Sequence, residues 1–125
     1  MADREDVRRI ALALPAVTEG ADGFGFGVRA GAKRKGFAWS WMERVTPKKP
    51  RVARPDVLVA RVPSLEEKQA LLDADPDIYF TEPHYNNYPA VLVRLPAIGT
   101  DELKELLTDA WRSQAPRALQ KEFDG

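Results

Sequence analysis

A two-residue alternation of large apolar side chains most constrains what this chain can fold into. In the segment 37–42 aromatic residues alternate with smaller side chains, FAWSWM. Such alternation places every second side chain on one face of an extended chain and is typical of a β-strand. The preceding segment Phe24–Val28 alternates apolar residues with glycine in the same period. We therefore predict a β-hairpin whose turn is Gly31–Gly36.

Two further segments extend this predicted sheet. Asp56–Val62 reads as a third strand, joined to the second by the connector Glu43–Pro55, which is rich in proline and positive charge. Proline lacks the N–H that a sheet requires, so the connector is expected outside regular strand pairing. Ala90–Leu95 is almost continuously apolar, which indicates a strand near the centre of the sheet.

Helical periodicity marks three other segments. Asp3–Leu14 has an apolar stripe and ends before Pro15. Ser64 followed by Glu67 is a capping box that begins a helix running to about Asp75. That helix is expected to face the core with Leu65, Leu71 and Leu72. The C-terminal helix begins at Thr100 or Asp101 and carries the clearest helical stripe in the chain, namely Leu103, Leu106, Leu107, Ala110 and Trp111.

The resulting element order is α-β-β-β-α-β-α. At 125 residues, with 44% hydrophobic and 30% charged residues, the chain has the length and composition of one globular domain. No linker divides it, so we predict a single domain over residues 1–125. Hairpin-connected strands between helices predict an α+β fold, an antiparallel sheet with helices packed on one face.

The composition excludes several classes of site. The chain has no cysteine and one histidine, so disulfides, thiolate nucleophiles, thiolate-ligated metals and histidine clusters are excluded. We expect no cofactor and no metal. No apolar run has the roughly 18–20 residues of a membrane span, and the N-terminus lacks a cleavable signal pattern. The expectation is a cytoplasmic protein, monomeric and without a membrane partner.

The distribution of charge is the strongest functional signal. The whole chain has a net charge of zero, but residues 29–61 hold ten lysines and arginines against two acids, a local charge of +8. The cations concentrate at the two predicted hairpin tips, which we expect the sheet to project side by side. The candidate phosphate ligands are Lys33, Arg34, Lys35, Lys48, Lys49, Arg51 and Arg54.

Such cations can be interpreted as phosphate ligands or as charges with another role. Lysine and arginine at adjacent tips could contact the phosphates of a nucleic acid, with a strong dependence on salt and no base readout. Equally, lysines on edge strands keep sheets from pairing with neighbours, and a basic surface also suits an acidic protein partner. Trp39 and Trp41 could stack on bases beside the tips, but their alternation with Phe37 favours one buried face shared by all three.

The aromatic stretch after residue 76 offers a weaker candidate. Tyr79, His84 and Tyr85 could frame a small-molecule pocket, and His84 could act as a base oriented by Glu82 or Asp77. No nucleophile or electrophile accompanies it. The alternative is a packed loop in which the aromatic residues cover the core. We therefore expect no enzymatic activity.

Three stretches resemble the MmcQ/YjbR family: ALALPAVTEG, LLDADPDIYFTEPHY and VLVRLPAIGTDELKELLTDAWRSQAPRAL. The resemblance covers nearly the whole chain. It implies a small α+β domain of CyaY-like arrangement, labelled DNA-binding because two projecting hairpins resemble a double wing. The connector TPKKPRVARP is longer and more basic than the family pattern at this place.

Taken together, charge and resemblance lead to the expectation of a non-enzymatic domain that binds DNA through phosphates at its basic tips, without sequence specificity. The alternative is a protein-interaction module with no nucleic-acid role. A ligand binder or enzyme centred on His84 is the third possibility.

Overall fold

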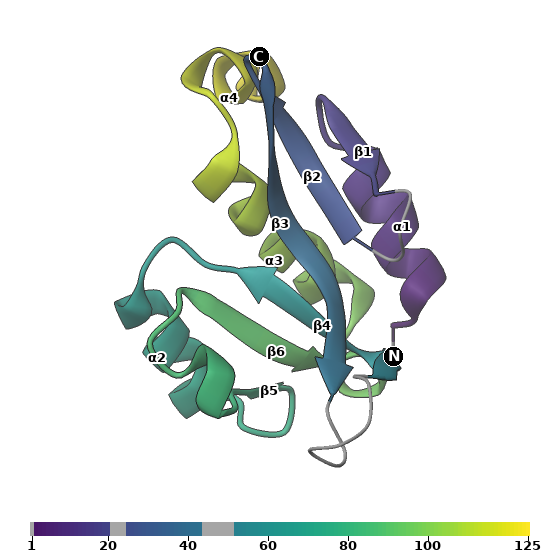
Figure 1. Ribbon diagram of the computed structural model, residues 1–125, viewed down its shortest axis with the longest axis vertical. Coiled ribbons are helices and arrows are strands. Elements are labelled where there is room, and N and C mark those ends of the chain that lie inside the picture. The colour runs from purple at the N-terminus through teal and green to yellow at the C-terminus, as the bar shows by residue number, and fades with distance from the viewer. Residues whose placement is uncertain (1, 21–24, 44–51) are drawn as a thin grey trace.

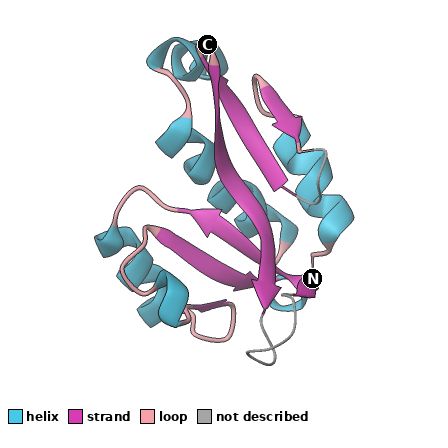
Figure 2. Ribbon diagram, in the orientation of Figure 1, coloured by secondary structure: helices cyan, strands magenta, loops and turns pink. Residues whose placement is uncertain are grey.

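The structure is a computed structural model that describes residues 2–20, 25–43 and 52–125. Its centre is a six-stranded antiparallel sheet in the order β1-β2-β3-β4-β6-β5 (Figures 1 and 2). The strands are β1 Val17–Glu19, β2 Gly25–Ala30, β3 Lys33–Glu43, β4 Val52–Arg61, β5 Tyr79–Phe80 and β6 Ala90–Arg94. The predicted α+β class is confirmed.

Four α-helices and two 3₁₀ turns accompany the sheet, and none of the described helices is long and apolar enough to cross a membrane. They are α1 Arg4–Leu12, α2 Leu65–Ala74, α3 Thr100–Gln114, α4 Arg117–Asp124, η1 Pro83–Tyr85 and η2 Leu95–Ala97. Helices α1 and α3 contact each other, and α3 contacts β2, β3 and β4 on one face of the sheet (Figure 1). Helix α2 lies against β5 and β6 at the other end of the sheet.

The predicted stripe of α3 forms the centre of the main core. Its five apolar side chains, from Leu103 to Trp111, are all buried between the sheet and α1. The Trp111 indole N–H also donates a hydrogen bond to the Pro15 carbonyl, 3.0 Å away. A buried indole needs such a partner, and this one ties α3 to the end of α1. In α1, Asp3 forms a reciprocal capping box with Asp6.

Helix α2 is rotated relative to the prediction. Ser64 caps it as expected, accepting a hydrogen bond from the Glu67 N–H at 3.2 Å. Leu71 and Leu72 pack against the core, but Leu65 is 48% exposed, so its predicted inward position was wrong. The residue that α2 buries is Lys68, which is 3% exposed. The helix faces a polar loop as well as the core, which a purely apolar pattern does not register.

A β-bulge at Phe37 divides the aromatic residues of β3 between the two faces of the sheet. Phe26 pairs with Ala38, whereas the next residue, Gly27, pairs with Gly36, so Phe37 is an extra residue in β3. Both Phe37 and Ala38 are therefore buried on the helix-covered side. The period shifts after the bulge, because an inserted residue reverses the alternation.

As a consequence, the prediction that Trp39 and Trp41 share a face with Phe37 was wrong. Both tryptophans are half-buried in a second, smaller cluster around Val59 and Leu92. That cluster lies on the face of the sheet away from α1 and α3.

The basic segments also lie differently from the prediction. The turn between β2 and β3 is Gly31–Ala32, where Gly31 has a left-handed φ of 65° that suits glycine. Lys33, Arg34 and Lys35 are therefore residues of β3, not of the turn. The β3–β4 connection leaves from Glu43, at the other end of the same strand. Consecutive hairpins of a meander turn at opposite ends of the strand they share. The two connections therefore leave β3 at its two ends, and the expectation of side-by-side tips, as in a double wing, was wrong (Figure 1).

Two leucines provide a test of these helix orientations. Leu107→Ala should lower the free energy of unfolding by about 2–5 kcal/mol, because it opens a cavity in the main core. Leu65→Ala removes the same atoms from an exposed site and should change it by less than about 0.5 kcal/mol. Urea unfolding followed by circular dichroism measures both. Equal losses for the two variants would contradict the orientation of α2 described above.

Candidate nucleic-acid interface

The three described candidate ligands of the β2–β3 hairpin do not share one face of the sheet. Lys33 and Lys35 are exposed and lie opposite Ala30 and Val28, on the helix-covered side of β3, while Arg34 lies on the other side. This division follows from the two-residue period of a strand. Lys48, Lys49 and Arg51 fall outside the described residues. The backbone of Arg54 belongs to β4, opposite Trp41, and its side chain is not described.

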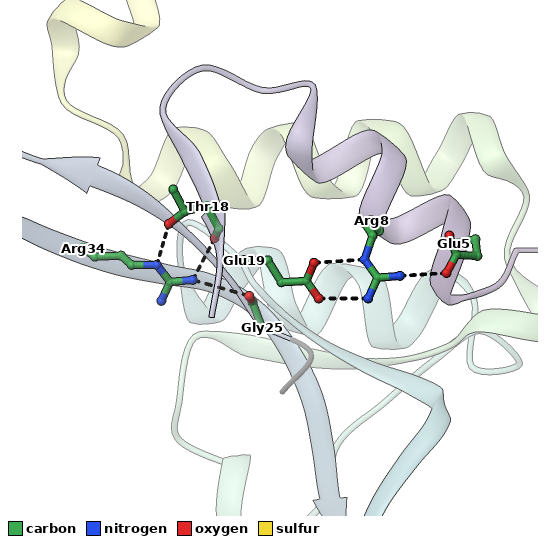
Figure 3. A network of polar contacts seen from close by, with 6 residues as sticks. All are labelled: Glu5, Arg8, Thr18, Glu19, Gly25 and Arg34. Atoms are coloured by element: carbon green, nitrogen blue, oxygen red, sulfur yellow. Dashed lines mark hydrogen bonds and ion pairs between the residues drawn. The ribbon is translucent and has the colours of Figure 1, made fainter. Parts of the chain in front are cut away.

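Arg34 is held in place by the edge of the sheet (Figure 3). Its Nε donates to Thr18 Oγ1 at 3.0 Å, and its Nη2 donates to the carbonyls of Thr18 at 2.8 Å and Gly25 at 3.4 Å. The side chain lies across Gly27, where a Cβ atom would come within 2.8 Å of the guanidinium carbon. The glycine alternation of β2 thus makes room for an arginine, a role that the sequence analysis did not assign.

A second arginine fixes β1 from the helix side (Figure 3). Arg8 of α1 donates from Nε and Nη2 to the two carboxylate oxygens of Glu19, at 2.9 and 3.0 Å, and from Nη1 to Glu5 at 2.7 Å. The hydrogen bonds from Arg8 hold the pKa of the Glu19 carboxyl below its usual value. Both carboxylate oxygens of Glu19 therefore accept hydrogen bonds from Arg8 of α1 and point away from Arg34.

The face of the sheet away from α1 and α3 carries an aromatic cluster from β3, β5 and η1. The indole N–H of Trp39 donates to the Tyr85 hydroxyl at 3.2 Å. Trp41 meets Phe80 edge to face, with ring centroids 5.8 Å apart. These rings are half-buried, so Trp39 and Trp41 are neither core residues nor open stacking platforms.

Two arginines on the same face lie over aromatic rings. The guanidinium carbon of Arg94 lies 4.2 Å from the Phe80 ring centre, and that of Arg61 lies 5.0 Å from the Tyr88 ring centre. Contacts of this kind stabilise a cation without a carboxylate. The sequence offered no signal for these pairs, because β4, β5, β6 and the loop that carries Tyr88 meet only in the folded protein.

Lys68 secures the loop that carries these tyrosines. Its ammonium group donates hydrogen bonds to the carbonyls of Tyr85 and Tyr88, the latter at 3.0 Å. Burial lowers the pKa of Lys68, because the charged form loses solvation. Two carbonyl partners offset part of that cost. The lysine therefore joins α2 to the loop through the backbone, and it was missed by the sequence analysis.

The predicted pocket of Tyr79, His84 and Tyr85 is not formed. The Tyr79 hydroxyl donates to Glu102 on the opposite, helix-covered side of the sheet at 2.5 Å, and burial raises the pKa of Tyr79 strongly. Phe80, one residue on, is the side chain that faces the aromatic cluster, as strand alternation requires.

His84 itself is exposed and contacts the Tyr85 ring edge to face at 5.0 Å. The Glu82 carboxylate accepts a hydrogen bond from the backbone N–H of His84 at 3.1 Å, and so caps η1. Among the described residues no three His, Asp or Glu side chains are grouped to hold a metal.

Residues 12–113 match a family model described as YjbR. Uncharacterized proteins of Mycobacterium bovis and Mycobacterium tuberculosis are 40% identical over 129 residues, covering 98% of this chain and 96% of theirs. The crystal structure of a Deinococcus radiodurans protein with a DUF419 domain has a TM-score of 0.68 at 22% identity, covering 99% of this chain and 89% of that one. The last likeness confirms the fold.

The hydrogen bonds of Arg34 predict that it stabilises the sheet edge. Arg34→Ala should lower the free energy of unfolding by about 1 kcal/mol, since it removes hydrogen bonds that hold β1 against β2 and β3. Lys33→Ala, which removes the same charge from the adjacent position, should have little effect. Denaturant unfolding measures this, and hydrogen exchange should show faster exchange at Val17–Glu19 in the Arg34 variant alone. Equal behaviour of the two variants would mean that Arg34 is not structural.

Proposed function

The chain belongs to the YjbR family, and from the distribution of its charge we propose that it binds nucleic acid through the phosphate backbone. The observation that carries this proposal is the charge of +8 over residues 29–61 in a chain of zero net charge. Cations that neutralise phosphates release condensed counterions, which favours binding without any base contact. The proposed ligand is DNA, bound without sequence preference.

The geometry of β3 supports a particular arrangement on a duplex. One end of the strand carries the exposed cations Arg29, Lys33 and Lys35 from the β2–β3 hairpin. At the other end the chain passes from Glu43 into residues 44–51, which include three of the candidate cations. Ten residue steps separate Lys33 from Glu43, and at no more than ~3.3 Å a step they span at most about 33 Å. One turn of a DNA duplex is about 34 Å, so the two ends suit phosphates one turn apart.

The roles of the cations within this interface differ. Lys33 and Lys35 have no described hydrogen bond and lie exposed on β3, so they are available to phosphates. The Nε and Nη2 groups of Arg34 already donate hydrogen bonds to Thr18 and Gly25. We therefore assign phosphate binding on this hairpin chiefly to the lysines. A lysine is a point charge that does not read a base edge, which is why no sequence preference is proposed.

An acidic protein is the alternative partner, since the same charge complementarity applies to it. A flexible acidic polypeptide has a lower and less regular charge density than a duplex. Competition with poly-glutamate at the same total charge distinguishes DNA from an acidic protein as the partner. If the interface prefers phosphates, poly-glutamate should displace little of the bound duplex.

The test is fluorescence anisotropy of a labelled duplex between about 50 and 200 mM salt. The wild-type chain should bind with a slope of log K against log salt that is strongly negative, by about 0.9 per phosphate contact. Lys33→Gln with Lys35→Gln should weaken binding and make the slope less steep by about 1.8. A triple variant with glutamine at Lys48, Lys49 and Arg51 should act in the same direction.

Lys104→Gln on α3 is the matched control, because it removes one exposed charge outside the basic segment and should leave the slope unchanged. Absence of binding at the lowest salt, or equal slopes for the control and the hairpin variants, would refute the proposal. Displacement of the duplex by poly-glutamate at equal charge would instead favour the acidic protein partner.

A further inference from the structure

A small basic hollow lies at the end of the β2–β3 hairpin, beside β1. It has a volume of about 240 Å³. It is lined by Thr18, Arg29, Gly31, Ala32, Lys33 and Arg34. Three of these six lining residues are arginine or lysine, and none of the six is acidic. Roughly 10–15 Å³ of such space already holds one water molecule, so the hollow is large enough for a small anion with part of its hydration.

The register of the hairpin places two like charges directly across from one another. Arg29 of β2 is the pairing partner of Arg34 of β3, and both side chains belong to the same face. Like charges in this position destabilise a sheet. The acid closest to them along β1, Glu19, has both carboxylate oxygens on Arg8. Both arginines are exposed, so solvent screens part of this repulsion, and an anion bound between the two guanidinium groups would offset it further.

Arg34 is already oriented for such an anion. Thr18 and Gly25 accept from its Nε and Nη2, and no hydrogen bond of Nη1 to another described residue is formed (Figure 3). A fixed guanidinium loses little freedom when it binds an oxyanion, which favours affinity. The Thr18 hydroxyl accepts from Arg34, so its own proton is available to donate.

We propose that this hollow binds a phosphate group, with Arg29 and Arg34 as its charged ligands and Thr18 beside them. The proposal rests on the nucleic-acid function for the source of that phosphate, a backbone phosphodiester. The proposed DNA contacts of the lysines are exposed side chains on a strand, whereas this site is a hollow in which Arg34 is already held in one orientation. A free phosphate monoester has the same recognition chemistry, and the experiment separates the two sources.

The experiment is a titration of the full-length, ¹⁵N-labelled protein followed by NMR at constant ionic strength. Inorganic phosphate and the dinucleotide dTpdT, which carries one phosphodiester, are the probes, with chloride as the reference. The backbone amides of Thr18, Arg29 and Gly31 should shift and saturate with both probes, and not with chloride. Arg29→Gln should weaken the affinity about tenfold or more, because a charge-assisted contact is lost.

Two further readouts separate binding from a structural role. Arg29→Gln relieves the cross-strand repulsion, so it should raise the melting temperature without phosphate and abolish the rise that phosphate produces in the wild-type chain. Lys104→Gln is the matched control, since it removes one exposed positive charge on α3 that does not line the hollow. It should leave the phosphate affinity unchanged. A lower melting temperature for Arg29→Gln, or equal affinity losses in both variants, would overturn the site.

The outcomes distinguish this proposal from the proposed function. Saturation by dTpdT supports a backbone phosphodiester, whereas saturation by inorganic phosphate alone overturns that source in favour of a free phosphate monoester. Absence of saturation with both probes, while the duplex still binds, overturns the hollow and leaves the lysine interface standing. Saturation by dTpdT without duplex binding supports the hollow and refutes the larger interface.

Discussion

The pairing of β3 with its two neighbours is the constraint on which the rest of the structure depends. A single extra residue at Phe37 turns Phe37 and Ala38 toward the helices and sends Trp39 and Trp41 to the other face. That shift places both Phe37 and Ala38 in the main core that α3 covers. It also creates the aromatic cluster on the face away from α1 and α3, where ring contacts and arginines replace a second layer of helices.

Positive charge serves two different purposes in this chain. Arg8 and Arg34 hold the short edge strand β1 from opposite sides, each through more than one hydrogen bond. Lys33 and Lys35, in the same basic segment, are exposed and have no such described bonds. A count of cations treats these residues alike, whereas their contacts separate structural arginines from lysines available to a partner. The proposed DNA interface depends on that distinction.

The family relationship and the geometry contribute different things. Membership of the YjbR family, with mycobacterial relatives described as uncharacterized, fixes the fold and leaves the ligand open. The proposal of a polyanion as ligand rests on the charge distribution and the length of β3. The sheet separates Tyr79 from His84 and Tyr85, so the small-molecule pocket predicted from these three residues is not formed.

The sequence by itself determined α1, α2 and α3, four of the six described strands and the position of excess charge. These are local properties: the stripe of α3, the Ser64 cap and the alternation in β2 and β3 each follow from short-range periodicity. Only the tertiary structure decided which face each aromatic residue of β3 occupies, because a one-residue bulge reverses the period. It likewise decided that Arg34 is held by Thr18 and that Lys68 is buried, since their partners lie 16 or more residues away in the chain.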